Sequence, residues 1–149
     1  MTDSYAVADA DPVATVLSWL AEHPKVAMAL GGPNRVSGIL EAPWPHLRVT
    51  AGAGGDLRNL SWAIEPEVAL EIYGDPGGWP GPAALRRALL MCAVATAELT
   101  DAPEDPMRPV VSRVRPSGML IDSPLATGQP RHILGLLVTL RPSEASTRR

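Results

Sequence analysis

The most regular alternation of hydrophobic and polar residues lies at positions 62–73, in the stretch WAIEPEVALEIY. Its even positions are apolar, whereas its odd positions include the three glutamates Glu65, Glu67 and Glu71. Successive side chains of a β-strand point to opposite faces of a sheet. The pattern therefore predicts a strand with one face against a hydrophobic core and a row of glutamates on the other.

Pro66 lies inside this strand, and proline has no backbone N–H to donate to a neighbouring strand. We therefore expect a bulge or break at Pro66, with residues 67–73 as the secure strand and residues 60–65 as a separate pairing segment. If that segment lies at a sheet edge, its unpaired backbone groups offer a neighbouring subunit a place to pair.

Two other segments have the period of an amphipathic helix. In residues 11–23, apolar side chains recur at i, i+3, i+4 and i+7, and Asp11 followed by Pro12 suits a helix start. In residues 82–99, an alanine-rich stripe that includes Cys92 covers about four helical turns. Pro24 ends the first of these helices.

The remaining segments are shorter. Residues 25–30 are consistent with one more turn of helix. Strands are predicted at residues 35–40, 46–51, 110–114, 119–121 and 132–140. Residues 52–59 (GAGGDLRN) and 122–131 are expected to be loops, and the ends at about 1–10 and 142–149 are expected to be flexible.

These elements predict a single α+β domain for the 149 residues. Two amphipathic helices cannot leave their apolar stripes in water, so we expect both on one face of a mixed or antiparallel sheet. The second face of the sheet is then left for another role.

Composition excludes several classes of protein. The net charge of −3, with Lys25 as the single lysine and twelve dispersed arginines, gives no basic patch for nucleic-acid binding. Cys92 is the single cysteine, so an intramolecular disulfide is impossible. We find neither a signal peptide nor an apolar run of membrane-spanning length, and expect a soluble protein made and kept in cytoplasm, or in an assembly formed there.

No catalytic, cofactor or metal site is predicted. Same-face glutamates about 6.6–7 Å apart on a strand could form a carboxylate pair or a cation site, but nothing nearby completes either, which favours a solvated face. His23, His46 and His132 lack the spacing of metal ligands. Cys92 falls on an inward helix stripe, and the glycines of AGAGGD match no phosphate-binding motif.

Tryptophans in loops are the other unusual feature. Trp44 and Trp79 lie in proline-rich turns, where an indole either folds back over a sheet end or anchors an interface. With Trp62, at the start of the alternating stretch, they are the candidate assembly contacts.

The layout resembles that of the tail terminator proteins of long-tailed bacteriophages, particularly those with actinobacterial hosts. The resemblance rests on a first helix of the form D-P-V-x-x-V-L-x-W-L-x-x-H-P and on the stretch APWPHLRVTAGAGGD. It continues through EVALEIYGDPGGWPGPAALRRAL to the paired strands of VSRVRPSGMLIDSPLATGQPRHILGLLVTL. It covers most of residues 11–141, in element order rather than in one diagnostic motif.

The resemblance implies a virion protein with no enzymatic activity. Such proteins form a hexameric ring that caps the head-proximal end of the tail tube, stops its polymerisation and docks the neck. The implied partners are other copies of the chain, the tube protein and a neck protein, with no membrane and with DNA only passing through. Glu65, Glu67 and Glu71 would then line the channel and repel the genome.

Two alternatives stay open. A head–tail connector would have the same kind of sequence layout and the same location, but it would form a different ring and bind different partners. A small α+β enzyme or ligand-binding domain would need a pocket with convergent polar groups, which the sequence does not indicate.

Overall fold

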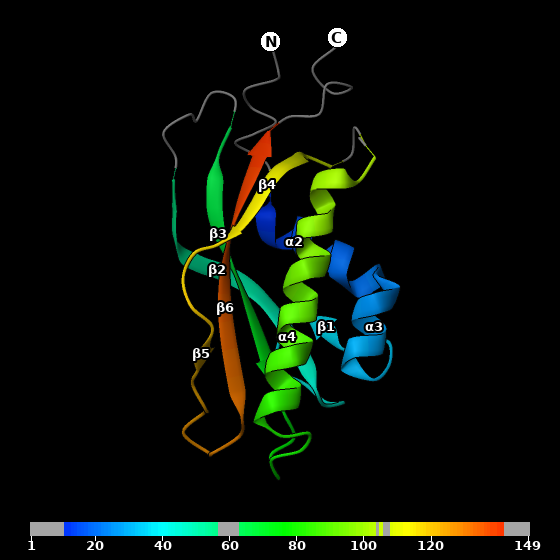
Figure 1. Cartoon of the computed structure of the whole chain (residues 1–149), viewed down its shortest axis with the longest axis vertical. Helices are drawn as coiled ribbons and strands as arrows, with labels where there is room; N and C mark the ends of the chain where they lie inside the picture. The colour runs from blue at the N-terminus through cyan, green and yellow to red at the C-terminus, as the bar shows by residue number, and fades with distance from the viewer. Residues whose placement is uncertain (1–10, 57–62, 104, 106–107, 142–149) are drawn as a thin grey trace.

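The computed structural model describes residues 11–56, 63–103, 105 and 108–141. Within these residues the chain is α+β, with three α-helices and a six-stranded sheet (Figure 1). In chain order the elements are α2 (Pro12–Glu22), α3 (Pro24–Leu30), β1 (Val36–Ser37), β2 (His46–Asp56), β3 (Glu65–Tyr73), α4 (Pro82–Ala97), the 3₁₀ turn η1 (Glu98–Asp101), β4 (Val110–Pro116), β5 (Ile121–Asp122) and β6 (Arg131–Arg141).

The sheet is mixed and mostly antiparallel. Its strand order is β1-β2-β3-β6-β4, and β5 pairs with the beginning of β6. Among the described strands, the β1–β2 pair alone is parallel. The long strands β3 and β6 therefore occupy the centre; β1 forms one edge, and β4 and β5 form the other.

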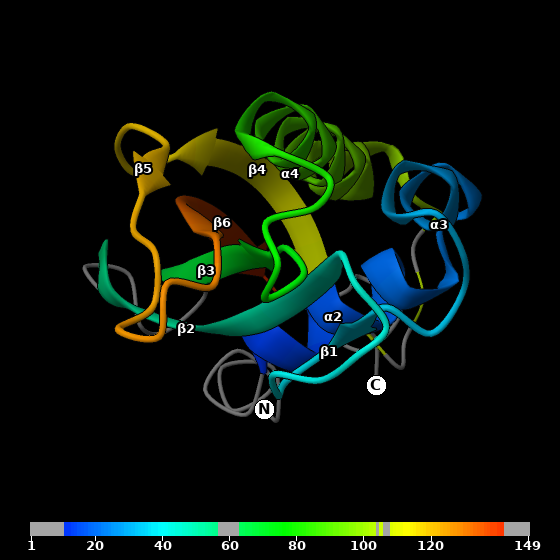
Figure 2. The same cartoon turned by 90° about the horizontal axis from the view of Figure 1, so that it is seen from below.

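The helices α2 and α4 pack on one face of this sheet, as their stripes predict, and α3 packs against both of these helices. Figure 2 shows α2, α3 and α4 grouped along one side of the curved sheet. The core contains Val16 and Leu20 from α2, Leu89 from α4, and the alternate residues of β3 and β6. From the apolar area that it buries, each such residue contributes roughly 1.5–3 kcal/mol to the stability of the fold, before the entropy cost of folding is subtracted.

Local chemistry explains where α2 and α3 begin and end. The Asp11 carboxylate accepts a hydrogen bond from the Ala14 N–H at 3.0 Å, so Asp11 caps α2 as predicted. His23 closes α2 and also caps α3, because its Nδ1 accepts from the Lys25 N–H at 3.2 Å. Pro24 opens α3, which makes residues 24–30 a full second helix that ends at Gly31 in the left-handed conformation.

The helix α4 matches its prediction within two residues at its end. Its stripe of Leu85, Leu89 and Cys92 is fully buried. The indole Nε1 of Trp19 on α2 donates to the Ala95 carbonyl at 2.7 Å, which fixes the crossing of the two helices. The chain then tightens into η1 rather than continuing as an α-helix to residue 99.

Part of the prediction for the central strand is confirmed and part is wrong. Strand β3 continues through Pro66, which pairs with Gly55 of β2 beside an irregularity in β2 between Ala51 and Gly55. The ladder between β3 and β6, however, is interrupted at Pro66: it ends at Glu67 and resumes at the bridge between Ile64 and Leu140. Residues 52–56, predicted as part of a loop, therefore continue β2, whereas residues 57–59 lie outside the described part of the chain. A bulge on the glycine-rich strand accommodates the mismatch because glycine adopts the required backbone angles, such as φ +133° at Gly55.

The segment before Pro66 is also not an edge where the structure describes it. Glu65 pairs with Asp56 of β2, and Ile64 bridges Leu140 of β6, so this part of the chain lies between two strands. The edges are instead β4 with β5 and, on the other side, the short β1, which spans two residues of the predicted strand at 35–40.

Candidate functional site

The sheet face that points away from the helices carries a hydrogen-bonded polar network, and we call it the open face. Residues directly opposite each other in a ladder share a face. The ladders therefore place the three glutamates of β3 on this face together with five arginines, Arg48 on β2, Arg113 and Arg115 on β4, and Arg131 and Arg141 on β6.

Glu71 is the most buried of the three glutamates, with 9% of its surface exposed. Its carboxylate accepts from the Thr50 hydroxyl at 3.1 Å and from the Tyr73 hydroxyl at 3.0 Å. Its Oε1 lies 3.6 Å from Nη1 of Arg131, whose Nε donates to the Ser123 carbonyl at 2.7 Å. Glu71 thus connects β2, β3 and β6 with the loop that follows β5.

Glu67 lies in a cradle made by glycines. Its carboxylate accepts from the Ser117 hydroxyl and from the Gly54 N–H, the latter at 3.0 Å. A methyl group added at Gly52 or Gly135 would lie 2.3 Å from Oε1 of Glu67 or from the Ser117 hydroxyl, respectively. The hydrogen bond from Ser117, followed by the one from Gly54, lowers the pKa of Glu67 below its usual value.

Glu65 connects β3 to β6 and to β4, on the side of the sheet away from β2. Nη2 of Arg115 donates to its carboxylate at 3.0 Å, and the Thr139 hydroxyl donates at 2.9 Å. The hydrogen bond from Arg115 is the main reason that the pKa of Glu65 lies below its usual value.

The three glutamates thus share a face, as the alternation predicts, but their interpretation as a solvated row is wrong. Each carboxylate is bound by side chains of neighbouring strands. Among the described side chains, five arginines accompany the three glutamates on this face. The open face therefore lacks the net negative charge that repulsion of DNA would require.

The candidate assembly tryptophans differ in their surroundings. Trp79 is 63% exposed in the turn before α4. Trp44 is half-buried between two cis-proline peptides, and its carbonyl accepts from Nη1 of Arg35 at 2.7 Å. Trp62 lies outside the described residues. Trp79 is therefore exposed, Trp44 is partly built into its turn, and the assembly role of either stays a prediction.

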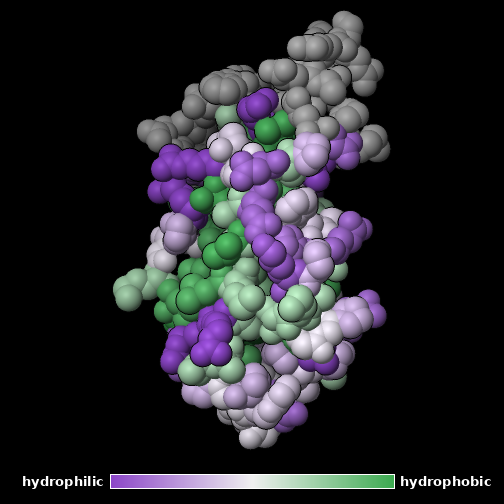
Figure 3. All heavy atoms as spheres, turned by 45° about the vertical axis from the view of Figure 1, so that its right-hand side comes forward, coloured by the Kyte–Doolittle hydropathy of each residue, from purple (hydrophilic) through white to green (hydrophobic). Residues whose placement is uncertain are grey.

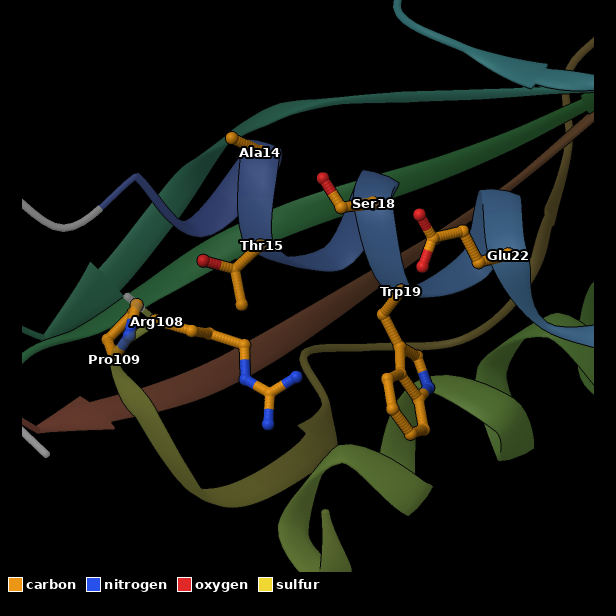
Figure 4. A pocket seen from close by; sticks show the side chains of 7 residues that line it. All are labelled: Ala14, Thr15, Ser18, Trp19, Glu22, Arg108 and Pro109. Carbon is orange, nitrogen blue, oxygen red and sulfur yellow. The ribbon is translucent and has the colours of Figure 1, made fainter. Parts of the chain in front are cut away.

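A groove of about 290 Å³ lies between α2 and the start of β4 (Figure 4). Trp19, Glu22 and Arg108 are among its lining residues, and no sequence motif had pointed to it. Nη2 of Arg108 already donates to the Pro103 carbonyl at 2.6 Å, and the Thr15 hydroxyl donates to the Asp11 carbonyl at 2.8 Å. Ser18 and Glu22 supply the remaining polar side chains of the groove (Figure 4).

Other chemistry in the described part of the chain is equally sparse. No three His, Cys, Asp or Glu side chains gather there in a way that could hold a metal ion. The Cys92 thiol is fully buried, and burial raises its pKa to about 12, which makes it a poor nucleophile. Within the same residues, no helix combines the length and hydrophobicity needed to cross a membrane.

Two buried histidines predict how stability depends on pH. Burial lowers the pKa of His46 and of His132 below the ordinary 6.5, so the folded chain keeps both neutral. Below about pH 6.5 the unfolded chain binds protons that the folded chain does not, and the free energy of unfolding should fall as the pH falls. Glu65 and Glu67 add to the loss as the pH falls below about 4.5.

Urea titrations between about pH 7.5 and about pH 5 check this expectation. A His46→Gln variant should show a shallower loss over that range because one of the two groups is removed. An unfolding free energy that stays constant, or rises, on acidification to pH 5 would contradict it.

The fold is similar to that of a chain in the solved structure described as "Virion of native gene transfer agent (GTA) particle". The TM-score is 0.57 and the sequence identity 14%, and the match covers 92% of this chain and 98% of the other. No protein-family model matches the sequence, and no curated protein matches it. The similarity therefore concerns the fold, over almost the full length of both chains.

Proposed function

We propose that this chain is a structural protein of a phage-like virion and that it acts there as a tail terminator. The observation that carries the proposal is the fold match to a virion chain across nearly the whole length of both proteins. A match of that extent leaves no additional domain on the other chain to account for its place in the particle. The element order that resembles the terminator family supports the finer assignment.

In this role the chain forms a ring, a hexamer by resemblance, that caps the head-proximal end of the tail tube. The ring stops tube polymerisation and presents a docking surface to the neck, with the tube protein and a neck protein as partners. A closed ring needs two different patches on each subunit. The open face, the exposed Trp79 and the sheet edges β1 and β4 supply surfaces of different character.

The glutamate row has a narrower role in this proposal than repulsion of the genome. Glu65, Glu67 and Glu71 are tied to neighbouring strands and accompanied by arginines. If the open face lines the channel, it presents DNA with carboxylates that are already hydrogen-bonded to neighbouring side chains.

A non-enzymatic role fits the chemistry of the described residues. Cys92 is buried with a raised pKa, and the glutamates are engaged in structural hydrogen bonds. A head–tail connector remains the second candidate, because a fold match to a virion chain favours it equally.

Two binding measurements test the proposal. Native mass spectrometry of the purified chain should show a closed ring, or a monomer that forms rings when tail tubes are added. Pull-down with the tube protein should then succeed in the absence of neck proteins. Capture by a portal-side neck protein without tube binding would assign the chain to the connector instead, and a stable monomer that binds neither would refute a virion role.

A further inference from the structure

The helix α4 is apolar on its outer side as well as on its core side. Residues 88–97 (ALLMCAVATA) contain no charged residue. Leu90, Met91 and Val94 are 50%, 45% and 64% exposed, although α4 is well packed through Leu89 and Cys92. A helix that is hydrophobic all round is normally buried on all sides. The outer side of α4 therefore lacks a cover in the isolated chain.

These exposed side chains form one surface. Arg87, Leu90, Met91 and Val94 follow each other at i, i+3, i+4 and i+7, so they line one stripe of the helix, which we call the α4 patch. Figure 3 shows the corresponding hydrophobic area left of centre, open to solvent. Arg86 and Arg87 are both exposed, and they make the N-terminal end of this stripe basic.

A second apolar surface lies in the loop after β1. Ile39 and Leu40 are 60% and 40% exposed, and the exposed acid Glu41 follows them; we call these three residues the β1 tip. Figure 2 shows α4 at the top and β1 at the bottom, so the two surfaces lie on opposite sides of the molecule.

The β1 tip is held in place before it binds anything. The Ser37 hydroxyl accepts from the Ile39 N–H at 3.2 Å and lies 3.0 Å from the Ile39 carbonyl. Its oxygen is also 2.8 Å from Nε2 of the buried His46. A rigid loop loses little conformational entropy on association, so it suits a docking element.

We propose that the β1 tip of one subunit docks on the α4 patch of the next copy of this chain. The inference rests on the proposed ring and names its subunit contact. Ile39 and Leu40 cover Leu90, Met91 and Val94, and Glu41 lies against the basic end of the patch at Arg87. The chemistry is complementary in both polarity and charge, and two different patches on opposite sides give the head-to-tail contact that closes a ring.

Mixing two defective variants tests this contact directly. The tip variant carries Ile39→Asp and Leu40→Asp; the patch variant carries Leu90→Glu and Val94→Glu. Each variant alone should be monomeric by native mass spectrometry, because it lacks one of the two surfaces that the contact needs. Their equimolar mixture should form a one-to-one heterodimer and nothing larger, since one intact tip meets one intact patch.

Met28→Glu is the matched control. Met28 is 81% exposed on α3 and belongs to neither surface, so this variant should assemble as the unmodified chain does. Circular dichroism confirms that every variant is folded. Where the unmodified chain forms rings, single variants that still form rings, or a mixture that stays monomeric, would overturn the proposal.

Disulfide trapping covers the case in which isolated rings are too weak to detect. The variant Leu40→Cys/Val94→Cys should give a ladder of covalent oligomers on oxidation, whereas either single cysteine should not, and the buried Cys92 cannot compete. The absence of a ladder would overturn the contact. If the ladder forms but the rings never bind tail tubes, the contact stands and the terminator role fails. If only tube binding is lost in the patch variant, α4 belongs to the tube interface instead.

Discussion

Replacing Leu89 by Ala should lower the free energy of unfolding by about 2–5 kcal/mol, whereas the same change at its neighbour Leu90 should cost less than about 0.5 kcal/mol. Leu89 is fully buried between α4 and the sheet, and its truncation leaves a cavity that the packed core cannot close. Leu90, the next residue of the same helix, is turned about 100° away from it and is 50% exposed.

Urea denaturation of both variants measures the difference. The two residues also separate fold from assembly, because Leu90→Ala should weaken the subunit contact while the chain stays stable. Equal losses of stability at both positions would mean that the outer side of α4 is already buried within one chain, which would contradict the exposed α4 patch.

Replacing Glu71 by Ala should lower the free energy of unfolding by about 2–4 kcal/mol. The substitution removes the acceptor for Thr50 and Tyr73 and leaves the Arg131 guanidinium without its carboxylate. The figure is below that for a fully buried ion pair because the Arg131 side chain is 23% exposed. Glu71→Gln should lose less, since the amide oxygen still accepts from both hydroxyls.

Glu22→Ala provides the comparison, because Glu22 is exposed at the end of α2. Its effect on the free energy of unfolding should lie within about 0.5 kcal/mol. Thermal or urea unfolding of the three variants ranks them. A Glu71→Ala variant as stable as Glu22→Ala would show that the glutamate is solvated, as the sequence alone suggested.

Strong periodicity explains what the sequence could predict. The helices α2 and α4 and the strand β6 each repeat apolar residues over the length that becomes buried. Local caps such as Asp11 and Gly81 then placed the starts of the helices. The α+β class and the face that the helices cover follow from those stripes.

Contacts between segments that are distant in the sequence explain why the surroundings of the glutamates could not be predicted. Arg115 meets Glu65 across fifty positions of sequence, and Ser117 meets Glu67 across the same distance, because β4 pairs with β6. Nothing in the alternation of β3 reveals that pairing, so an exposed face was the ordinary expectation.

Glycines account for the remaining error. Residues 52–55 looked like a loop because glycine is common in turns. The structure uses them within β2, where Gly52 leaves room for the Glu67 carboxylate beside the strand. A glycine needed for close approach and a glycine needed for a turn look the same in sequence.

Electron microscopy of particles assembled without this chain tests the terminator role most directly. If the ring stops tube growth, the tubes should be overlong and should lack heads, and adding back the purified chain should restore a uniform length. The patch variant Leu90→Glu/Val94→Glu should fail to restore it, whereas Met28→Glu should succeed. Tails of normal length that merely fail to join heads would contradict the terminator role and assign the chain to the head–tail connector.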